Sequence, residues 1–147
     1  LRVTTIRFFN TVGPRQVGHY GMVVPHFVSS ALSDDPLQVY GSGEQVRCFC
    51  HVSDAVKALI QVIDSDKAVG EVFNIGNNQP IKLMSFIEEI ENQLDKKAIL
   101  HLLPMQPGDL LATFSDISPL QKLGFQPKID YKKGIFEFVK WYNSYYK

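Results

Sequence analysis

Residues 3–15 read VTTIRFFNTVGPR, and this stretch decides which fold the sequence predicts. Its first part, Val3 to Phe9, is rich in β-branched and aromatic residues and nearly continuous in apolar character around Arg7. That pattern is typical of a buried strand in a parallel sheet, because helices cover both faces of such a sheet. The polar and glycine-containing segment from Asn10 to Arg15 then ends the strand.

Strands and helices alternate along the rest of the chain, which predicts an α/β fold. Apolar periodicity and turn residues predict strands at 37–40, 45–52, 71–75 and 98–103, and helices near 21–32, 53–63, 85–94, 118–124 and 130–145. Ser53, Ser118 and Asp130 are the expected N-caps, and Ser85 with Glu88 forms an expected capping box. Gly41 to Glu44 is expected to join the strands at 37–40 and 45–52 as a hairpin.

Composition sets limits on the kind of partner. Fifteen basic and fifteen acidic residues among 147 give a formal net charge of zero, so no overall field attracts nucleic acid or an anionic membrane. The sequence contains no run of about 18 apolar residues, so it does not predict a membrane-spanning helix. Cys48 and Cys50 are one residue apart in an extended stretch, where a mutual disulfide would be strained. Reduced thiols, and therefore a cytoplasmic location, are expected.

Three familiar kinds of site are absent from the sequence or weak in it. The nearest approach to a phosphate-binding glycine loop, Gly41 to Val46, lacks a third glycine and leads into a strand. No tyrosine is followed by lysine four residues later. The segment Cys48 to His51 lacks the usual spacing of metal ligands, so its cysteines are interpreted as small apolar strand residues. We therefore assign no catalytic residue and no metal site to this chain.

Two polar residues favour a bound anion, each with an alternative. Asn10 follows the first strand, and ligands of open α/β sheets gather at the carboxyl ends of strands, but the same side chain could begin an Asx turn. Arg47 lies in an apolar run, so its charge needs a partner. That partner is either a ligand phosphate, which a guanidinium binds in a bidentate fork, or an internal acid such as Asp54 or Asp109.

Several blocks, taken together and in order, resemble the extended short-chain dehydrogenase/reductases that act on nucleotide sugars, a family typified by UDP-glucose 4-epimerase and UDP-glucuronate-modifying relatives. The resemblance covers essentially all 147 residues and is to the C-terminal, substrate-binding portion of that family. The blocks are RFFNTVGPR at 7–15, VYGSG at 39–43 with Arg47, HVSD at 51–54, VFNIG at 72–76, PGD at 107–109, DIS at 116–118 and LG at 123–124.

The resemblance implies a set of ligand contacts. It implies that Asn10 contacts the sugar diphosphate, Tyr40 the base, Arg47 a phosphate and Asp109 the ribose of a nucleotide-sugar substrate. It also implies that Phe8, Gly13 and Pro14 lie near the nicotinamide end of an NAD cofactor. Two positions depart from the family: Gln106 stands where arginine is common, which removes a second phosphate-holding charge, and His26 replaces a basic residue in an expected structural position.

The fold implied by the resemblance is the far edge of a Rossmann-type sheet, formed by residues 1–9 and 71–75, with a smaller α/β substrate lobe. The near half of that sheet, with its glycine-rich loop, serine and tyrosine–lysine pair, is not in these residues. We therefore expect residues 1–147 to be the nucleotide-sugar-binding portion of an NAD-dependent epimerase/dehydratase, for example a UDP-glucose 4-epimerase, and to be inactive alone. The alternative is a non-catalytic module that binds a nucleotide sugar or a partner protein.

Removing half of the sheet would leave the strand at Val3 to Phe9 with an open edge and uncovered apolar faces. We expect this strand to pair with another copy of the chain, giving a homo-oligomer, or to be hidden by rearrangement. The sequence leaves open whether the parent reaction is 4-epimerisation, 4,6-dehydration or decarboxylation.

Overall fold

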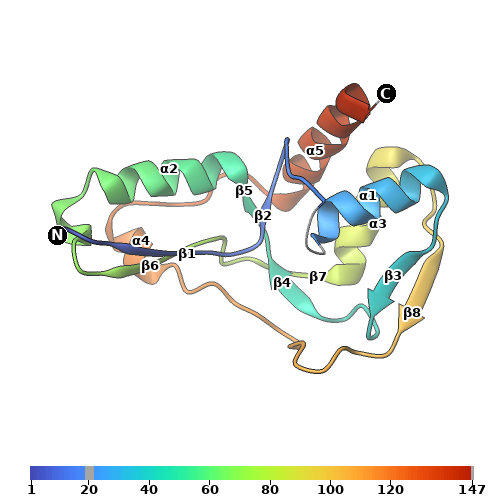
Figure 1. The fold of residues 1–147 in the computed structure, drawn as a ribbon, viewed down its shortest axis with the longest axis horizontal. Coiled ribbons are helices and arrows are strands. Elements are labelled where there is room, and N and C mark those ends of the chain that lie inside the picture. The colour runs from blue at the N-terminus through green and yellow to red at the C-terminus, as the bar shows by residue number, and fades with distance from the viewer. Residues whose placement is uncertain (19–21, 147) are drawn as a thin grey trace.

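The computed structural model describes residues 1–18 and 22–146, which form two neighbouring α/β parts (Figure 1). In the first part, β1 (Thr5–Phe8) pairs in parallel with β6 (Val72–Ile75). The helices α2 (Val52–Ile63) and α4 (Ser118–Lys122) pack beside these strands, together with the short 3-10 helix η2 (Asp66–Ala68). The two strands expected from the sequence at the sheet edge are therefore neighbours, with Thr5 opposite Val72 and Phe8 opposite Ile75.

The second part is a separate α/β unit. It contains α1 (Val23–Ser33), α3 (Leu83–Leu94) and α5 (Tyr131–Tyr146), with β3 (Leu37–Tyr40) and β8 (Leu100–Leu103) paired in parallel. The helix predicted near 21–32 is confirmed as α1, although its expected start at Gly21 lies outside the described residues. Pro25 falls in the first turn of α1, where its missing N–H costs no helical hydrogen bond.

Each part has its own hydrophobic core. The core of the first part is built mainly from α2, β6 and the α4 region, and the core of the second part from α1, β3, α3 and α5. Two short strand pairs lie where the parts meet (Figure 1). They are β2 (Thr11–Val12) with β5 (Cys50–His51) in parallel, and β4 (Val46–Cys48) with β7 (Pro80–Lys82) in antiparallel orientation.

The hairpin predicted across Gly41 to Glu44 is wrong. Both β3 and β4 exist, but β3 pairs with β8 and β4 pairs with β7. Gly41 and Gly43 do supply the positive φ angles of a turn, at 80° and 79°. The turn is held instead against the start of α3, where the N–H of Met84 donates to Gly43 O and the N–H of Leu83 donates to Gln45 O. These contacts direct the chain away from β3.

Four expected helix starts can be compared with the structure. Asp130 is confirmed as a cap, since its Oδ1 accepts the N–H of Lys133 at 2.9 Å. The other three helices begin earlier than predicted, with His51, Lys82 and Ile117 as the N-cap residues in place of Ser53, Ser85 and Ser118. The reason in α2 and α3 is that each helix follows a strand directly, so strand pairing fixes where the helix starts.

The buried carboxylate of Asp54 ties α2 to the C-terminal part of the chain. Its Oδ2 accepts the N–H groups of Lys128 at 2.7 Å and Ile129 at 2.8 Å. Asp54 is therefore not the partner of Arg47. In the part of the chain that the structure describes, no helix is both long and apolar enough to span a bilayer.

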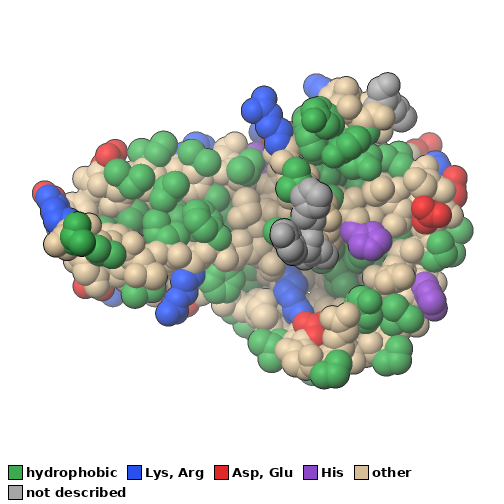
Figure 2. All heavy atoms as spheres, viewed as in Figure 1, with side chains coloured by type: hydrophobic (Ala, Val, Ile, Leu, Met, Phe, Trp, Pro, Cys, Tyr) green, Lys and Arg blue, Asp and Glu red, His purple; other side chains and the backbone are tan. Residues whose placement is uncertain are grey.

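An apolar surface remains open on the first part. Among residues 1–18 and 22–146, β6 is the only strand paired with β1, so the other edge of β1 is free. Val56, Ile60 and Ile63 form a stripe on one side of α2, and Ile63 is 70% exposed. Figure 2 shows hydrophobic side chains gathered over the region of α2 and β1. We call Phe8 and the three α2 residues the open face.

We expect the chain alone to self-associate through this open face, because an unpaired strand edge beside exposed apolar side chains favours pairing between copies. Size-exclusion chromatography with light scattering should show a mass that rises with concentration, and Ile60→Lys should reduce that rise. Leu111→Lys, at a 70% exposed loop residue outside the open face, is the control. A monomer at all concentrations that binds no hydrophobic dye would contradict this expectation.

Candidate functional site

A cleft of about 980 Å³ contains all seven residues that the sequence analysis selected as ligand contacts. Its walls come from the β1–β2 segment, α1, β3, β4 and the loop before α4. The seven residues are Phe8, Asn10, Gly13, Pro14, Tyr40, Arg47 and Asp109. The structure brings them together from four separate segments of the chain, and their individual contacts with a ligand stay predictions.

Two arginines line the cleft, and Arg47 on β4 is less exposed than Arg15. The side chain of Arg47 is only 19% exposed, its Nη1 donates to Val46 O at 2.9 Å, and its Nη2 donates to Asp109 Oδ1 at 2.6 Å. The internal partner considered for Arg47 is thus present, and it is Asp109. Since Asp109 is itself an expected ligand contact, the ion pair joins two predicted binding residues.

The loop that carries Asp109 is held beside β4 by backbone hydrogen bonds. Val46 N donates to Leu111 O at 2.8 Å, and Thr113 N donates to Val46 O at 3.1 Å. The Asp109 carboxylate also accepts the N–H of Leu110 at 2.9 Å. A smaller cavity of about 370 Å³ lies against the same ion pair and shares Arg47, Asp109 and Asn10 with the main cleft. The Arg47–Asp109 pair therefore forms part of the wall of both cavities.

Asn10 lies at the carboxyl end of β1, as expected. Its amide Nδ2 donates to the carbonyl of Cys48 at 3.3 Å. The sequence analysis gave an Asx turn as the alternative role of Asn10, and among the described residues no hydrogen bond of such a turn is present. The contact with Cys48 holds Asn10 against β4, and Asn10 and Arg47 both line the two cavities.

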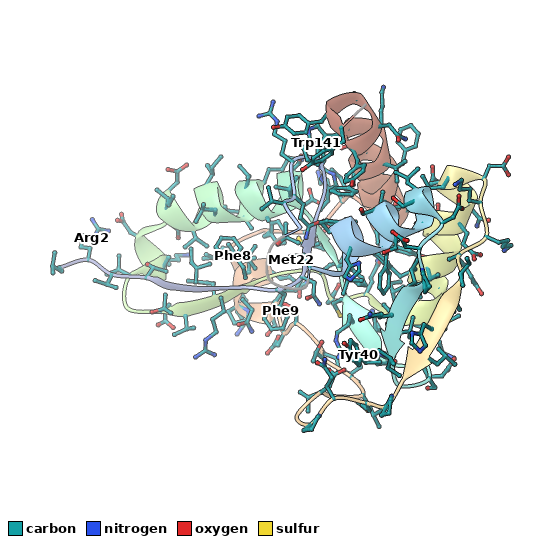
Figure 3. The ribbon with its side chains drawn as sticks, turned by 45° about the vertical axis from the view of Figure 1, so that its right-hand side comes forward. Arg2, Phe8, Phe9, Met22, Tyr40 and Trp141 are labelled. Carbon is teal, nitrogen blue, oxygen red and sulfur yellow. The ribbon has the colours of Figure 1, made fainter. Side chains whose placement is uncertain are left out.

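Tyr40 is the last residue of β3, at the far end of the cleft from β1 (Figure 3). The backbone of Tyr40 is held by Gln45, whose buried side-chain amide donates to Tyr40 O at 2.6 Å. Figure 3 also shows Phe8, the last residue of β1, and Phe9, which follows it, on opposite sides of the chain. Both phenylalanines line the cleft.

Gly13 and Pro14 form the predicted cofactor end of the cleft. Gly13 has a φ of 149°, a backbone angle that residues other than glycine rarely adopt. A Cβ added to Gly13 would lie 2.6 Å from Val52 Cγ1 and 3.4 Å from His51 Nε2. Glycine is therefore required here both by backbone conformation and by the close approach of β2 to the start of α2.

The cysteines have the structural role that the sequence favoured. Both are free and buried, and Cys50 is within the core of the first part. Burial, and next the negative charge of Asp54, raises the pKa of the Cys50 thiol to about 12. Such a thiol stays protonated at neutral pH and is a poor nucleophile or metal ligand. In the described part of the chain, no three His, Cys, Asp or Glu side chains are grouped to hold a metal ion.

Sequence reasoning missed several cleft residues. Gln38 on β3 lines the cleft, as do Gln45 and Phe49 on either side of β4, and the partners of both strands were not predicted correctly. His26, interpreted as structural, also lines the cleft from α1, and its Nδ1 is 3.3 Å from Ser30 Oγ. Gln106 lines it as well, so the position where arginine is common in the resembling family does face the site.

Comparison with known proteins assigns the family. Residues 1–76 match the sequence model of the NAD dependent epimerase/dehydratase family. The chain belongs to this family. A relative is the UDP-N-acetyl-alpha-D-glucosaminuronate decarboxylase of Bacillus cytotoxicus, which is 33% identical over 152 residues. The match covers 98% of this chain and 47% of the relative.

Two solved epimerase structures share the fold. The UDP-N-acetylglucosamine 4-epimerase of Methanobrevibacter ruminantium, in complex with UDP-N-acetylmuramic acid, is 33% identical with a TM-score of 0.89. The match covers 98% of this chain and 47% of that one. The UDP-glucuronic acid 4-epimerase of Bacillus cereus, in complex with UDP-glucuronic acid and NAD, is 25% identical with a TM-score of 0.90, and the match covers 98% and 46%. The chain thus spans less than half the length of each protein.

In this member of the epimerase/dehydratase family, we expect Gly13→Ala to lower the free energy of unfolding by about 3–5 kcal/mol, since backbone strain and overpacking against a stiff valine add. Urea unfolding measures the change. The control is Gly70→Ala, where φ is 84° but no atom lies within 4 Å of the added Cβ. It should cost only about 1–2 kcal/mol, the strain of the left-handed conformation. Equal losses would show that the close approach to Val52 does not constrain Gly13.

Proposed function

We propose that this chain is the nucleotide-sugar-binding portion of an NAD-dependent sugar-nucleotide epimerase/dehydratase, acting on a UDP-sugar such as UDP-glucose. The observation that carries the proposal is the convergence of the seven predicted contact residues on one cleft, which includes the largely buried side chain of Arg47. UDP-sugars and NAD are bound by solved structures of the same fold, which supports this class of ligand.

In this proposal the cleft orders the ligand from one end to the other. Tyr40 meets the base, Arg47 and Asn10 meet the diphosphate, and Asp109 meets the ribose. The sugar then extends toward Gly13 and Pro14. Holding a substrate in a reactive orientation can lower a barrier by several kcal/mol, but only when the reacting groups are also present. The contribution of this chain is therefore to position the sugar.

The Arg47–Asp109 ion pair determines which contacts must change when a nucleotide sugar binds. A substrate phosphate that takes the fork of Arg47 must share the guanidinium with Asp109 or displace it. A guanidinium has five N–H donors, and Nη1 already donates to Val46 O. If Asp109 turns from Arg47 to a ribose hydroxyl, the carboxylate keeps a partner while the phosphate replaces it on Arg47. The ion pair thus stabilises the empty cleft without a permanent unpaired charge.

The residues present fit only one end of an NAD molecule. Phe8, Gly13 and Pro14 line the end of the cleft that we assign to the nicotinamide. Most dinucleotide binding comes from a glycine-rich loop at a helix N-terminus, and the sequence contains no such loop. When bound, NAD supplies a hydride acceptor for the sugar. In our proposal a Rossmann half outside residues 1–147 holds the rest of the cofactor and the catalytic tyrosine–lysine pair.

The open face supports the proposal that the cofactor and the catalytic pair are held by a Rossmann half outside residues 1–147. A free β1 edge next to an apolar stripe on α2 matches the place where a further parallel strand and its helix would continue the sheet. The second candidate, a non-catalytic module that binds a nucleotide sugar, uses the same cleft. It gives no reason for the open face, which is why we place it second. Relatives include 4-epimerases and a decarboxylase, so the proposal rests on the shared substrate class rather than on one reaction.

In the intact enzyme, Arg47→Ala should weaken nucleotide-sugar binding by about 1.5–3 kcal/mol, the usual loss for a hydrogen bond to a charged group. Lysine at this position should restore only part of the affinity, because it lacks the bidentate fork. Isothermal titration with a UDP-sugar measures the change. Arg2→Ala, which removes a 71% exposed arginine paired with Asp66, should leave affinity unchanged. Unchanged affinity with a lower melting temperature in Arg47→Ala would instead mean that Arg47 serves only the internal ion pair.

For the chain alone we expect no turnover and negligible affinity for NAD, because the chain encodes no pyrophosphate-binding loop. Calorimetric titration of the chain with NAD tests this expectation. Binding in the micromolar range or tighter would show that the cofactor site lies within residues 1–147.

A further inference from the structure

A partly buried polar contact joins the C-terminal helix α5 to the predicted cofactor end of the cleft. His51 ends β5 and is only 2% exposed, and it lies opposite Val12 of β2. Its Nε2 is 3.1 Å from Oε2 of Glu137 on α5. Neither residue is among those that line the cleft. The contact therefore calls for an explanation other than direct ligand binding.

The hydrogen bonds of His51 fix which ring nitrogen carries the proton. Nδ1 accepts the N–H of Ser53 at 3.1 Å, so Nδ1 has no proton of its own. The ring proton is on Nε2, which donates it to the Glu137 carboxylate. One imidazole thus caps α2 and anchors α5 at the same time. Because both ring nitrogens are used, the ring has one orientation.

Two glycines bring the backbone against this fixed ring. A Cβ at Gly13 would be 3.4 Å from His51 Nε2, and a Cβ at Gly134 would be 3.5 Å from His51 Cδ2 and 2.8 Å from Val12 Cγ1. The β2 segment is therefore packed between α5 and the start of α2, with the ring against its end. A displacement of the ring would change the position of the Gly13 backbone, and with it Pro14.

We propose that Glu137 is a positioning residue that acts through His51 on the Gly13–Pro14 backbone. The assignment of this backbone to the nicotinamide end of the cleft rests on the proposed function. Arg47, Tyr40 and Asp109 lie on other segments, so the contact should affect the placement of reacting groups more than the grip on the nucleotide. A misplacement of about 1 Å by a distant residue can lower a rate by about 100-fold.

Glu137 offers a set of closely matched variants. Glu137→Ala removes the acceptor, whereas Glu137→Gln keeps an oxygen that accepts from Nε2. The other neighbour of the carboxylate, Lys133, is 3.8 Å from Oε1 and 59% exposed, an ion pair of little energetic value. Lys133→Ala therefore alters the charge next to Glu137 without touching His51, and it is the control.

The first measurement is hydrogen exchange followed by mass spectrometry in the intact protein, which requires no activity. We expect Glu137→Ala to speed exchange in the segment 10–16 by at least about tenfold, with the segment 100–103 of β8 unchanged. Glu137→Gln and Lys133→Ala should exchange like the unmodified protein. Faster exchange in both segments would show a general loss of stability, and no change in segment 10–16 would show no coupling. Either result would overturn the proposal.

The second measurement is steady-state kinetics of the intact enzyme with its nucleotide sugar. Glu137→Ala should lower kcat by about 10- to 100-fold and leave KM for the nucleotide sugar within about twofold, with rescue in Glu137→Gln. A rise in KM at constant kcat, or equal loss in the Ala and Gln variants, would refute positioning through the hydrogen bond. If the unmodified intact protein turns over no nucleotide sugar, the proposed function fails, and the exchange experiment still decides whether Glu137 positions Gly13.

Discussion

The pairing of β2 with β5 is the constraint on which the rest of the structure depends. Thr11 lies opposite Cys50 and Val12 opposite His51, so two short segments join the two hydrophobic cores at one place. Glycine at positions 13 and 134 lets backbone, imidazole and helix pack together there. Since β1 leads into β2, and β4 leads into β5, this junction also sets where Asn10 and Arg47 stand relative to each other. The cleft exists because these segments are fixed at the junction.

The charge of Arg47 in the cleft is paired before any ligand binds. A guanidinium in a partly dehydrated wall needs an anionic or hydrogen-bonded partner, and Asp109 supplies it. The functional consequence is that affinity is a difference between two pairings of Arg47, one internal and one with the ligand. Gln106 contributes no charge beside them, and the other arginine that lines the cleft, Arg15, is exposed, so our proposal assigns phosphate recognition to Arg47.

The cleft and the open face correspond to two parts of the enzyme, a substrate-binding lobe and a larger parallel sheet of which these residues supply an edge. The described residues build a complete lobe around α1, α3 and α5, but only two strands of a parallel sheet. A two-stranded parallel sheet buries little surface by itself, and its apolar side chains then remain on the outside. Relatives about twice as long share the same fold over this region, so the apolar surface fits a role as a contact with further parts of the sheet.

The candidate contacts with a nucleotide sugar rest on the family resemblance, whereas the sequence by itself determined the class of fold and the positions of most strands and helices. Periodicity identifies these features because burial of a strand or helix face is a local property of the chain. Tertiary structure alone decided that β3 pairs with β8, that His51 rather than Ser53 caps α2, and that Arg47 meets Asp109. Gln38 and Gln45 were missed for the same reason. These pairings depend on which segments, distant in sequence, become neighbours in the fold. A local sequence pattern carries no information about such a partner, as with Arg47 and Asp109, which are 62 residues apart.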